Sequence, residues 1–297
     1  ALGAGGARGF AHVAVLRRLC AKEMVPSVIT GSSMGSVIGS AFALFKDIRT
    51  VEKLLGYFVE KSAKNILELT RTLQGKVSLT GKLSAAYKTT ATRSMMNEYF
   101  LYDLISSIFG KARFSDTKIP LGIVATDAQT GKKELFDYGF ISDAVCASSA
   151  VPGAFAPVPL AGSHYVDGGV TRVVPVEEAY RLGAKTVIGV DVSYVPKKQR
   201  FENIFDLIAH VDDLKGERLV KMDMERAQLA IYFDSLDIEW FRFDRVDEII
   251  EKSDKIARQT SNVIVRHFGW MGRVAVAPLV GDDDMVARRD KGGNLIA

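Results

Sequence analysis

The chain has 297 residues, of which 47% are hydrophobic and 25% charged, and its formal net charge is +4. This balance is that of a globular protein with one large domain or two smaller ones, and it excludes a chain that is disordered as a whole. The two cysteines, Cys20 and Cys146, lie far apart in apolar, helix-like settings, which argues against a disulfide framework and against a Cys/His metal site.

The sequence shows no export signal and no membrane-spanning segment. It contains no run of 18 or more apolar residues and no signal-peptide pattern. We therefore expect a protein of the cytoplasm or one that binds peripherally at a membrane surface. A glycine loop begins almost at the first residue, so a leader sequence ahead of this loop in the natural protein remains an alternative.

The first predicted element is this glycine loop, Leu-Gly-Ala-Gly-Gly-Ala-Arg-Gly at residues 2–9, which leads into an amphipathic helix over residues 10–19. A dinucleotide-binding Gly-x-Gly-x-x-Gly frame begins in the loop. It fails because Arg8 stands where the third glycine belongs and no acidic residue ends the next strand. We therefore predict no cofactor. Consecutive glycines at Gly5 and Gly6 instead let two backbone N–H groups converge on an anion, and Arg8 adds a positive charge beside them.

A second glycine-flanked turn follows at Gly31-Ser32-Ser33-Met34-Gly35, between a short apolar strand at residues 28–29 and a helix-like run over residues 36–45. This is the pattern of a nucleophile elbow, in which a strained turn needs small residues on both sides of the serine. Ser33 is therefore the candidate nucleophile, and the alternative is a strand-to-helix turn without chemistry. Two adjacent strands of one βαβ unit would place this turn and the glycine loop at the same edge of a sheet.

Residues 46–110 have a helical pattern that is weakest in the middle. Residues 61–93 hold seven basic side chains and one acidic one, a composition that fits a solvated face and also a surface that binds anionic lipid headgroups. Tyr87 is the one aromatic residue in this stretch, so nucleic acid is a poor candidate partner. We predict that residues 62–92 form a basic, mobile cap over the site.

Strands and helices alternate from residue 119 to about residue 192, and helical patterns dominate beyond residue 200. The predicted elements are strands over residues 119–127 and 133–136, a helix over 141–149, a hairpin over 157–169 that ends in Asp167-Gly168-Gly169, a helix over 175–182 and a buried strand over 185–192. Two helical stretches, 205–231 and 246–264, then precede a polar tail over residues 281–297.

A serine nucleophile needs a group that accepts its proton, and the sequence offers two kinds. Two of the four histidines, His210 and His267, follow Asp191 in the order of an α/β-hydrolase triad, but both lie in ordinary helical patterns. Asp167 is the sharper candidate, because the two glycines after it clear space for a substrate and a carboxylate at a strand end can take the proton directly. The alternative for Asp-Gly-Gly is a plain tight turn.

Three motifs in this order resemble the signature set of the patatin-like phospholipases, namely Gly5-Gly6-Ala7-Arg8-Gly9, Gly31-Ser32-Ser33-Met34-Gly35 and Asp167-Gly168-Gly169. Residues 147–152 are similar to the family's block ahead of its catalytic aspartate, and the match covers about residues 1–195. The resemblance is closest to the bacterial and neuropathy-target-esterase-like branch.

This resemblance implies a dyad of Ser33 and Asp167, without histidine or metal, that cleaves acyl esters of phospholipids or lysophospholipids. It also implies that Gly5, Gly6 and Arg8 stabilise the oxyanion. Ala4 departs from the family pattern, in which a third glycine is common there, and we expect an oxyanion hole at the two following glycines to survive this change.

We therefore predict a three-layer α/β/α hydrolase of the patatin-like type around a central, mostly parallel sheet. The catalytic domain spans residues 1–200, and a helical extension over residues 201–280 packs on the same domain. The expected partners are a phospholipid or lysophospholipid substrate and an anionic membrane surface, whereas the oligomeric state is not predicted. Two alternatives stay open: a Ser-His-Asp triad carboxylesterase, and a non-catalytic nucleotide- or lipid-binding module on a related fold.

Overall fold

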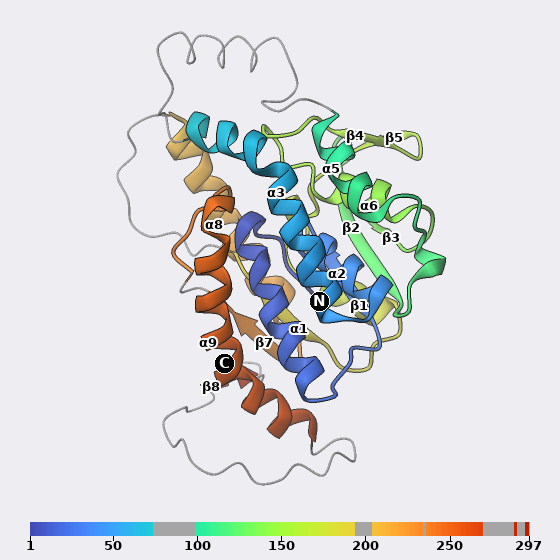
Figure 1. Ribbon diagram of the computed structural model, residues 1–297, viewed down its shortest axis with the longest axis vertical. Helices are drawn as coiled ribbons and strands as arrows, with labels where there is room; N and C mark the ends of the chain where they lie inside the picture. Colours follow the sequence, from blue (N-terminus) through green and yellow to red (C-terminus); the bar gives the residue numbers. More distant parts are fainter. Residues whose placement is uncertain (74–98, 194–203, 234–235, 270–287, 290–294, 297) are drawn as a thin grey trace.

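The computed structural model describes residues 1–73, 99–193, 204–233, 236–269, 288–289 and 295–296 (Figure 1). Helix α3 (Ile48–Leu73) continues into the first part of the predicted cap, and residues 74–98 lie outside the described residues. The cap therefore stays a prediction. Within the described ranges, every helix falls short of the length and hydropathy that a bilayer span requires.

The helices and strands alternate along the first two thirds of the chain, as the sequence predicts. The α-helices are α1 (Ala11–Ala21), α2 (Met34–Phe45), α3, α5 (Phe100–Phe109), α6 (Ile141–Ser148), α7 (Val176–Arg181), α8 (Ile204–Met224) and α9 (Val246–Gly269). Short 3₁₀ helices are η1 (Gly6–Phe10), η2 (Phe114–Asp116), η3 (Gly168–Val170) and η4 (Phe243–Arg245). The strands are β1 (Ile29–Ser32), β2 (Leu121–Asp127), β3 (Lys133–Phe136), β4 (Val158–Leu160), β5 (Ser163–Val166), β6 (Ile188–Asp191), β7 (Leu229–Tyr232), β8 (Arg288–Arg289) and β9 (Leu295–Ile296).

Leu2 joins two groups of strands into one sheet. It forms parallel bridges to Gly31 of β1 and to Val190 of β6. The strand order through this junction is β8-β9-β7-β6 on one side and β1-β2-β5-β4 on the other, with β3 also paired to β2. The glycine loop and the Ser33 turn therefore leave adjacent parallel positions at one edge of the sheet, as predicted.

The sheet combines parallel and antiparallel strand pairs. β1 pairs in parallel with β2, and β6 pairs in parallel with β7, so the centre is parallel. β2 with β3 and β4 with β5 are antiparallel hairpins, because the turns that join them are too short for a crossover.

Two hydrophobic clusters cover the two faces of the sheet and give the predicted three layers. The larger cluster packs α1, α2, α3, α5, α6 and α9, which lie mostly on the near side in Figure 1. The smaller cluster packs α7 and the second half of α8 against β6 and β7, through side chains that include Val176, Val187 and Val220. α2 is buried at every residue from 34 to 43, because it lies between the sheet and neighbouring helices.

Two predictions for the carboxyl-terminal third are wrong. The helical stretch over residues 205–231 ends in strand β7, which pairs with β6. This short apolar run fits a buried helix and a buried strand equally well from sequence, and only its partner strand decides between them. In the predicted polar tail, Leu295 and Ile296 pair with β7 and extend the sheet, while most of the remaining tail lies outside the described residues.

Candidate active site

The backbone of Ser33 is strained. Its φ of 51° and ψ of −125° lie in a region that residues with a side chain rarely adopt, at a cost on the order of 1–3 kcal/mol. The strain is held because β1 ends at Ser32 and α2 begins at Met34, so the chain reverses at this single residue. The Ser33 carbonyl accepts hydrogen bonds from the N–H and the hydroxyl of Ser36, at 2.8 and 2.6 Å.

The glycine loop packs directly against this turn. A Cβ atom on Gly35 would lie 2.7 Å from the Gly3 carbonyl oxygen, and one on Gly9 would lie 2.6 Å from Met34 Cβ. Real Cβ atoms essentially never approach so closely, so only glycine lets the two segments meet. The spacing of the glycines in both motifs therefore reflects close contact between the loop and the Ser33 turn.

The Asp-Gly-Gly loop completes the site. A Cβ atom on Gly168 would lie 2.6 Å from Ser32 Oγ, and one on Gly169 would lie 3.0 Å from Ala4 Cβ. The loop thus touches both the Ser33 turn and the glycine loop. The structure brings together all three motifs that the sequence analysis selected.

Two consecutive N–H groups of the glycine loop have no hydrogen-bond acceptor in the described part of the chain. The N–H groups of Gly3 and Ala4 bind the carbonyls of Val190 and Val173, both at 2.9 Å. Further along the loop, the Ala7 N–H binds the Trp240 carbonyl at 2.7 Å and the Arg8 N–H binds the Gly5 carbonyl at 3.2 Å. Among the described residues, no acceptor takes the N–H groups of Gly5 and Gly6 that lie between these pairs. Such neighbouring donors can bind an anion.

The conformation of Gly6 is one that only glycine adopts without cost. Its φ of 55° turns the chain at the start of η1. This bend packs against the side chain of Val192 and the backbone of Trp240. A Cβ atom on Gly5 would lie 2.6 Å from Val192 Cγ2. Both supports come from chain segments that the sequence analysis did not connect with the site.

Asp167 is a buried carboxylate whose pKa is shifted towards neutrality. The pKa is raised from its ordinary value of 3.8 to about 6, chiefly by burial and to a smaller extent by the charge of Asp212, against the opposing hydrogen bonds from the Ser33 side chain and the Gly169 N–H. The Gly169 N–H lies 2.7 Å from Oδ1. Within the described part of the chain, Oδ2 has no hydrogen-bond partner.

Ser148 supports the strained turn, and the sequence analysis missed this role. Its hydroxyl accepts the Ser33 N–H at 2.9 Å and donates to the Val124 carbonyl at 2.6 Å. Next to it, the Asp167 N–H binds the Ala150 carbonyl at 3.0 Å. The block at residues 147–152, noted from the resemblance alone, therefore holds the backbone of both candidate residues.

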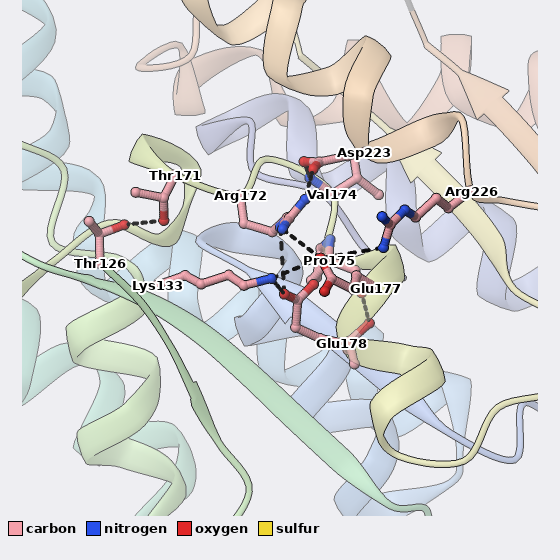
Figure 2. Close-up of polar contacts among 11 residues, drawn as sticks. Thr126, Lys133, Thr171, Arg172, Val174, Pro175, Glu177, Glu178, Asp223 and Arg226 are labelled. Atoms are coloured by element: carbon pink, nitrogen blue, oxygen red, sulfur yellow. Dashed lines mark hydrogen bonds and ion pairs between the residues drawn. The ribbon is translucent and has the colours of Figure 1, made fainter. Parts of the chain in front are cut away.

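A network of buried and partly buried charges holds the segment that follows Asp167 (Figure 2). The Arg172 guanidinium donates to Asp223 at 2.5 Å and to Glu177 at 2.8 Å, and Lys133 donates to Glu178 at 2.7 Å. Asp223 also accepts the N–H of Val174 at 2.9 Å. The segment that follows Asp167 is thereby tied to α7, α8 and β3.

Thr126 fixes the other side of this loop. Its hydroxyl donates to the Asp167 carbonyl at 3.0 Å and lies 2.9 Å from the Thr171 hydroxyl. Figure 2 shows this threonine pair beside the charge network. Neither the threonine pair nor the charge network gives a sequence motif, because the residues involved are spread over about a hundred positions.

Arg8 is buried at the rim of the glycine loop. Its Nη1 donates to the Ile238 carbonyl at 3.3 Å, and its charge lowers the pKa of Asp213 against the larger effect of burial, which raises it. The structure thus gives Arg8 contacts towards the carboxyl-terminal part of the chain. Its predicted action on an oxyanion stays a prediction.

The alternative triad would use a histidine and Asp191, and the structure describes some of these residues. The buried His12 ring donates from Nε2 to the Gly3 carbonyl at 2.8 Å, and burial lowers its pKa to about 4, so it is neutral near pH 7. His210 lies partly exposed on α8, and the side chain of His267 lies outside the described residues. Asp191 accepts the Ser193 N–H at 2.9 Å.

Among the described residues, no three His, Cys, Asp or Glu side chains form a group suited to a metal ion.

Comparisons with known proteins agree with these motifs. The family model described as patatin-like phospholipase matches residues 1–180. An uncharacterized NTE family protein of Mycobacterium tuberculosis (strain ATCC 25618 / H37Rv) is 30% identical over 193 residues, which are 65% of this chain and 48% of that protein. A lysophospholipase of Debaryomyces hansenii is 30% identical over 194 residues, which are 65% of this chain and 12% of that protein.

Among solved structures, that of VipD from Legionella pneumophila resembles the chain with a TM-score of 0.48 and 14% identity, over 88% of this chain and 66% of that one. The chain thus spans about half the length of its mycobacterial relative and a small part of the Debaryomyces one.

Proposed function

The chain belongs to the patatin-like phospholipase family, and from this membership and the geometry of the site we propose that it is a serine hydrolase of lipid acyl esters. Ser33 is the nucleophile and Asp167 the general base. The observation that carries the proposal is the placement of a strained, glycine-flanked serine beside a buried carboxylate with a raised pKa. Strained backbone and shifted pKa values are both concentrated at functional sites.

In the first half of the reaction, the Ser33 hydroxyl attacks the acyl carbonyl carbon while the Asp167 carboxylate takes its proton. The carbonyl oxygen becomes an oxyanion that the open N–H groups of Gly5 and Gly6 stabilise. The tetrahedral intermediate then collapses to an acyl-enzyme. The protonated Asp167 returns its proton to the departing alcohol.

In the second half, water replaces the alcohol. Asp167 takes a proton from the water as it attacks the acyl-enzyme, and it returns this proton to Ser33 when the fatty acid leaves. A carboxylate with a pKa of about 6 suits both roles better than an ordinary one, because its basicity lies closer to neutral pH.

The proposed substrate is a phospholipid or a lysophospholipid. One relative is named as a lysophospholipase, and the family as a whole is described by phospholipase activity.

Labelling with a long-chain fluorophosphonate, followed by mapping of the modified peptide, tests the proposal. We expect label on Ser33 in the natural chain and no label in Ser33→Ala, which removes one oxygen atom and leaves the turn intact. Label on another serine would refute the assignment of Ser33, and an unlabelled natural chain would favour the non-catalytic binding module. His210→Ala and His267→Ala should both keep the label, whereas its loss in either variant would favour a histidine triad.

A further inference from the structure

Helix α8, drawn in tan in Figure 1, carries an unusual outer face. Four of its large apolar side chains are exposed, by 39% to 62%: Leu207, Val211, Leu214 and Met222. The first three are spaced four and three residues apart, so they lie on one side of the helix, and Met222 continues the same side two turns later. This face extends for about 22 Å along the helix axis.

Basic side chains lie on the same face. Lys215 and Lys221 are 69% and 68% exposed, and Arg218 is exposed between them. The two lysines pair with Asp212 and Glu217 on the helix itself, at 3.1 and 2.6 Å, but exposed pairs of this kind contribute little and exchange easily with other partners. The opposite side of the helix is anchored in the protein, where Val220 and Met224 are buried.

The outer face of α8 begins beside the candidate active site. The charge of Asp212 acts on Asp167, and the charge of Arg8 acts on Asp213. Both effects indicate that this part of α8 lies near the candidate active site. The exposed residues Val211 and Leu214 flank these two aspartates in the sequence.

We propose that this face, made of Leu207, Val211, Leu214, Lys215, Arg218, Lys221 and Met222, docks the protein on a phospholipid surface. The inference rests on the proposed function, because the ester substrate of such an enzyme is held in a bilayer or micelle. The apolar side chains enter the boundary between headgroups and acyl chains, and the basic ones bind phosphate groups. The active site then faces the lipid from which a substrate molecule is drawn.

The mixture of residues favours a lipid surface over a protein partner. The centre of a protein interface is depleted in lysine, and its apolar residues form one continuous patch. Here Lys215 directly follows Leu214 and Lys221 directly precedes Met222, so apolar and basic side chains are interleaved as in helices that lie in the membrane interface. A phospholipid surface offers both the apolar layer and the anionic groups that such a face requires.

The test compares binding of Ser33→Ala proteins to vesicles of mixed phosphatidylcholine and phosphatidylserine, measured by co-flotation. The Ser33→Ala background keeps the vesicles intact and makes binding independent of hydrolysis. Adding Leu207→Glu and Leu214→Glu should weaken vesicle binding by about tenfold or more, because each change removes an inserting side chain and adds a repelled charge. Adding Val25→Glu and Tyr138→Glu, at apolar loop positions that are exposed by 42% and 75%, should leave binding unchanged.

With Ser33 restored, a short-chain soluble ester separates docking from catalysis. The α8 variant should hydrolyse this ester within about twofold of the natural rate, yet lose most of its activity on vesicles. Unchanged vesicle binding by the α8 variant, or equal loss in the Val25 and Tyr138 variant, would overturn the proposal. A natural chain that ignores vesicles but changes its oligomeric state when the α8 face is altered would also overturn it, in favour of a protein interface. Failure of ester hydrolysis in the natural chain would refute the proposed function alone, since vesicle binding is measured without it.

Discussion

Replacing Asp167 with asparagine should remove catalysis and at the same time stabilise the protein. Asparagine keeps the oxygen that accepts the Gly169 N–H and preserves the volume of the side chain. It lacks a group that can take the Ser33 proton. We expect kcat/KM for ester hydrolysis to fall by about 10²–10⁴, the contribution typical of a positioned general base.

The gain in stability follows from the pKa of Asp167. Its folded-state value of about 6 lies above the ordinary 3.8, so the folded chain binds more protons than the unfolded chain between these two pH values. The free energy of unfolding therefore falls as pH rises from about 4 to 6. Above pH 6 the buried charge costs about 3 kcal/mol, from roughly two pKa units at 1.36 kcal/mol each. Asparagine carries no charge and escapes this cost.

Urea unfolding of both proteins across the pH range measures the effect. The Asp167→Asn variant should be more stable than the natural chain at pH 8, by up to about 3 kcal/mol, and the two should converge below about pH 4, as the natural carboxyl group becomes protonated in both states. Asp191→Asn is the matched control and should keep its turnover. An active Asp167→Asn enzyme would refute the dyad, and a variant less stable than the natural chain at pH 8 would refute the desolvation argument.

Three further changes test the surroundings of the dyad. Arg8→Met should lower kcat by about 10²–10³ with little change in KM if the guanidinium stabilises the oxyanion; steady-state kinetics decide this, and a loss of thermal stability with unchanged kcat would assign Arg8 a packing role instead. Ser148→Ala should slow fluorophosphonate labelling and cost about 1–3 kcal/mol of unfolding free energy, because the Ser33 N–H loses its buried acceptor. Labelling at the natural rate would contradict the supporting role of Ser148. Arg172→Met should lower the free energy of unfolding in urea by about 3–5 kcal/mol, because it leaves Asp223 charged and buried. The control Lys221→Met, at an exposed ion pair, should lower it by less than about 1 kcal/mol. Equal costs would mean that the network is fully solvated.

The pH dependence of catalysis cannot by itself separate the two mechanisms. An aspartate with an ordinary pKa would keep a dyad active well below the range in which histidine titrates. Because burial raises the pKa of Asp167 to about 6, the activity of the dyad should fall as pH drops through about 6, close to the limb that a histidine triad would give. The side-chain substitutions, and not the pH profile, therefore distinguish the dyad from the histidine triad.

The parts of the site that the sequence predicted are those that depend on close backbone approach. Ser33 and the glycines around it fix a strand, a strained turn and a helix within a few residues, and this local chemistry is visible without any partner. The meeting of the glycine loop and the Ser33 turn was also predictable, because loops at the same ends of parallel strands share one edge of the sheet. The structure agrees on both points.

Parts that depend on contacts across the whole chain were not predictable. Strand β7 follows a long helix with the same apolar character, and only pairing with β6 makes it a strand. The support of the glycine loop by Trp240 joins segments more than 200 residues apart, as does the bond from Arg8 to Ile238. No spacing rule connects such residues.

Helix α8 links the candidate active site to the proposed lipid surface through its two sides. Asp223 on its inner side binds Arg172 and the Val174 N–H, and so holds the segment that follows Asp167. The outer side carries the exposed apolar and basic residues. Because one rigid helix bears both sets of contacts, docking of the outer side on lipid would fix the orientation of the general base relative to the membrane. A bound phospholipid would then meet Ser33 in the same geometry at each encounter, which is how orientation lowers the barrier to reaction.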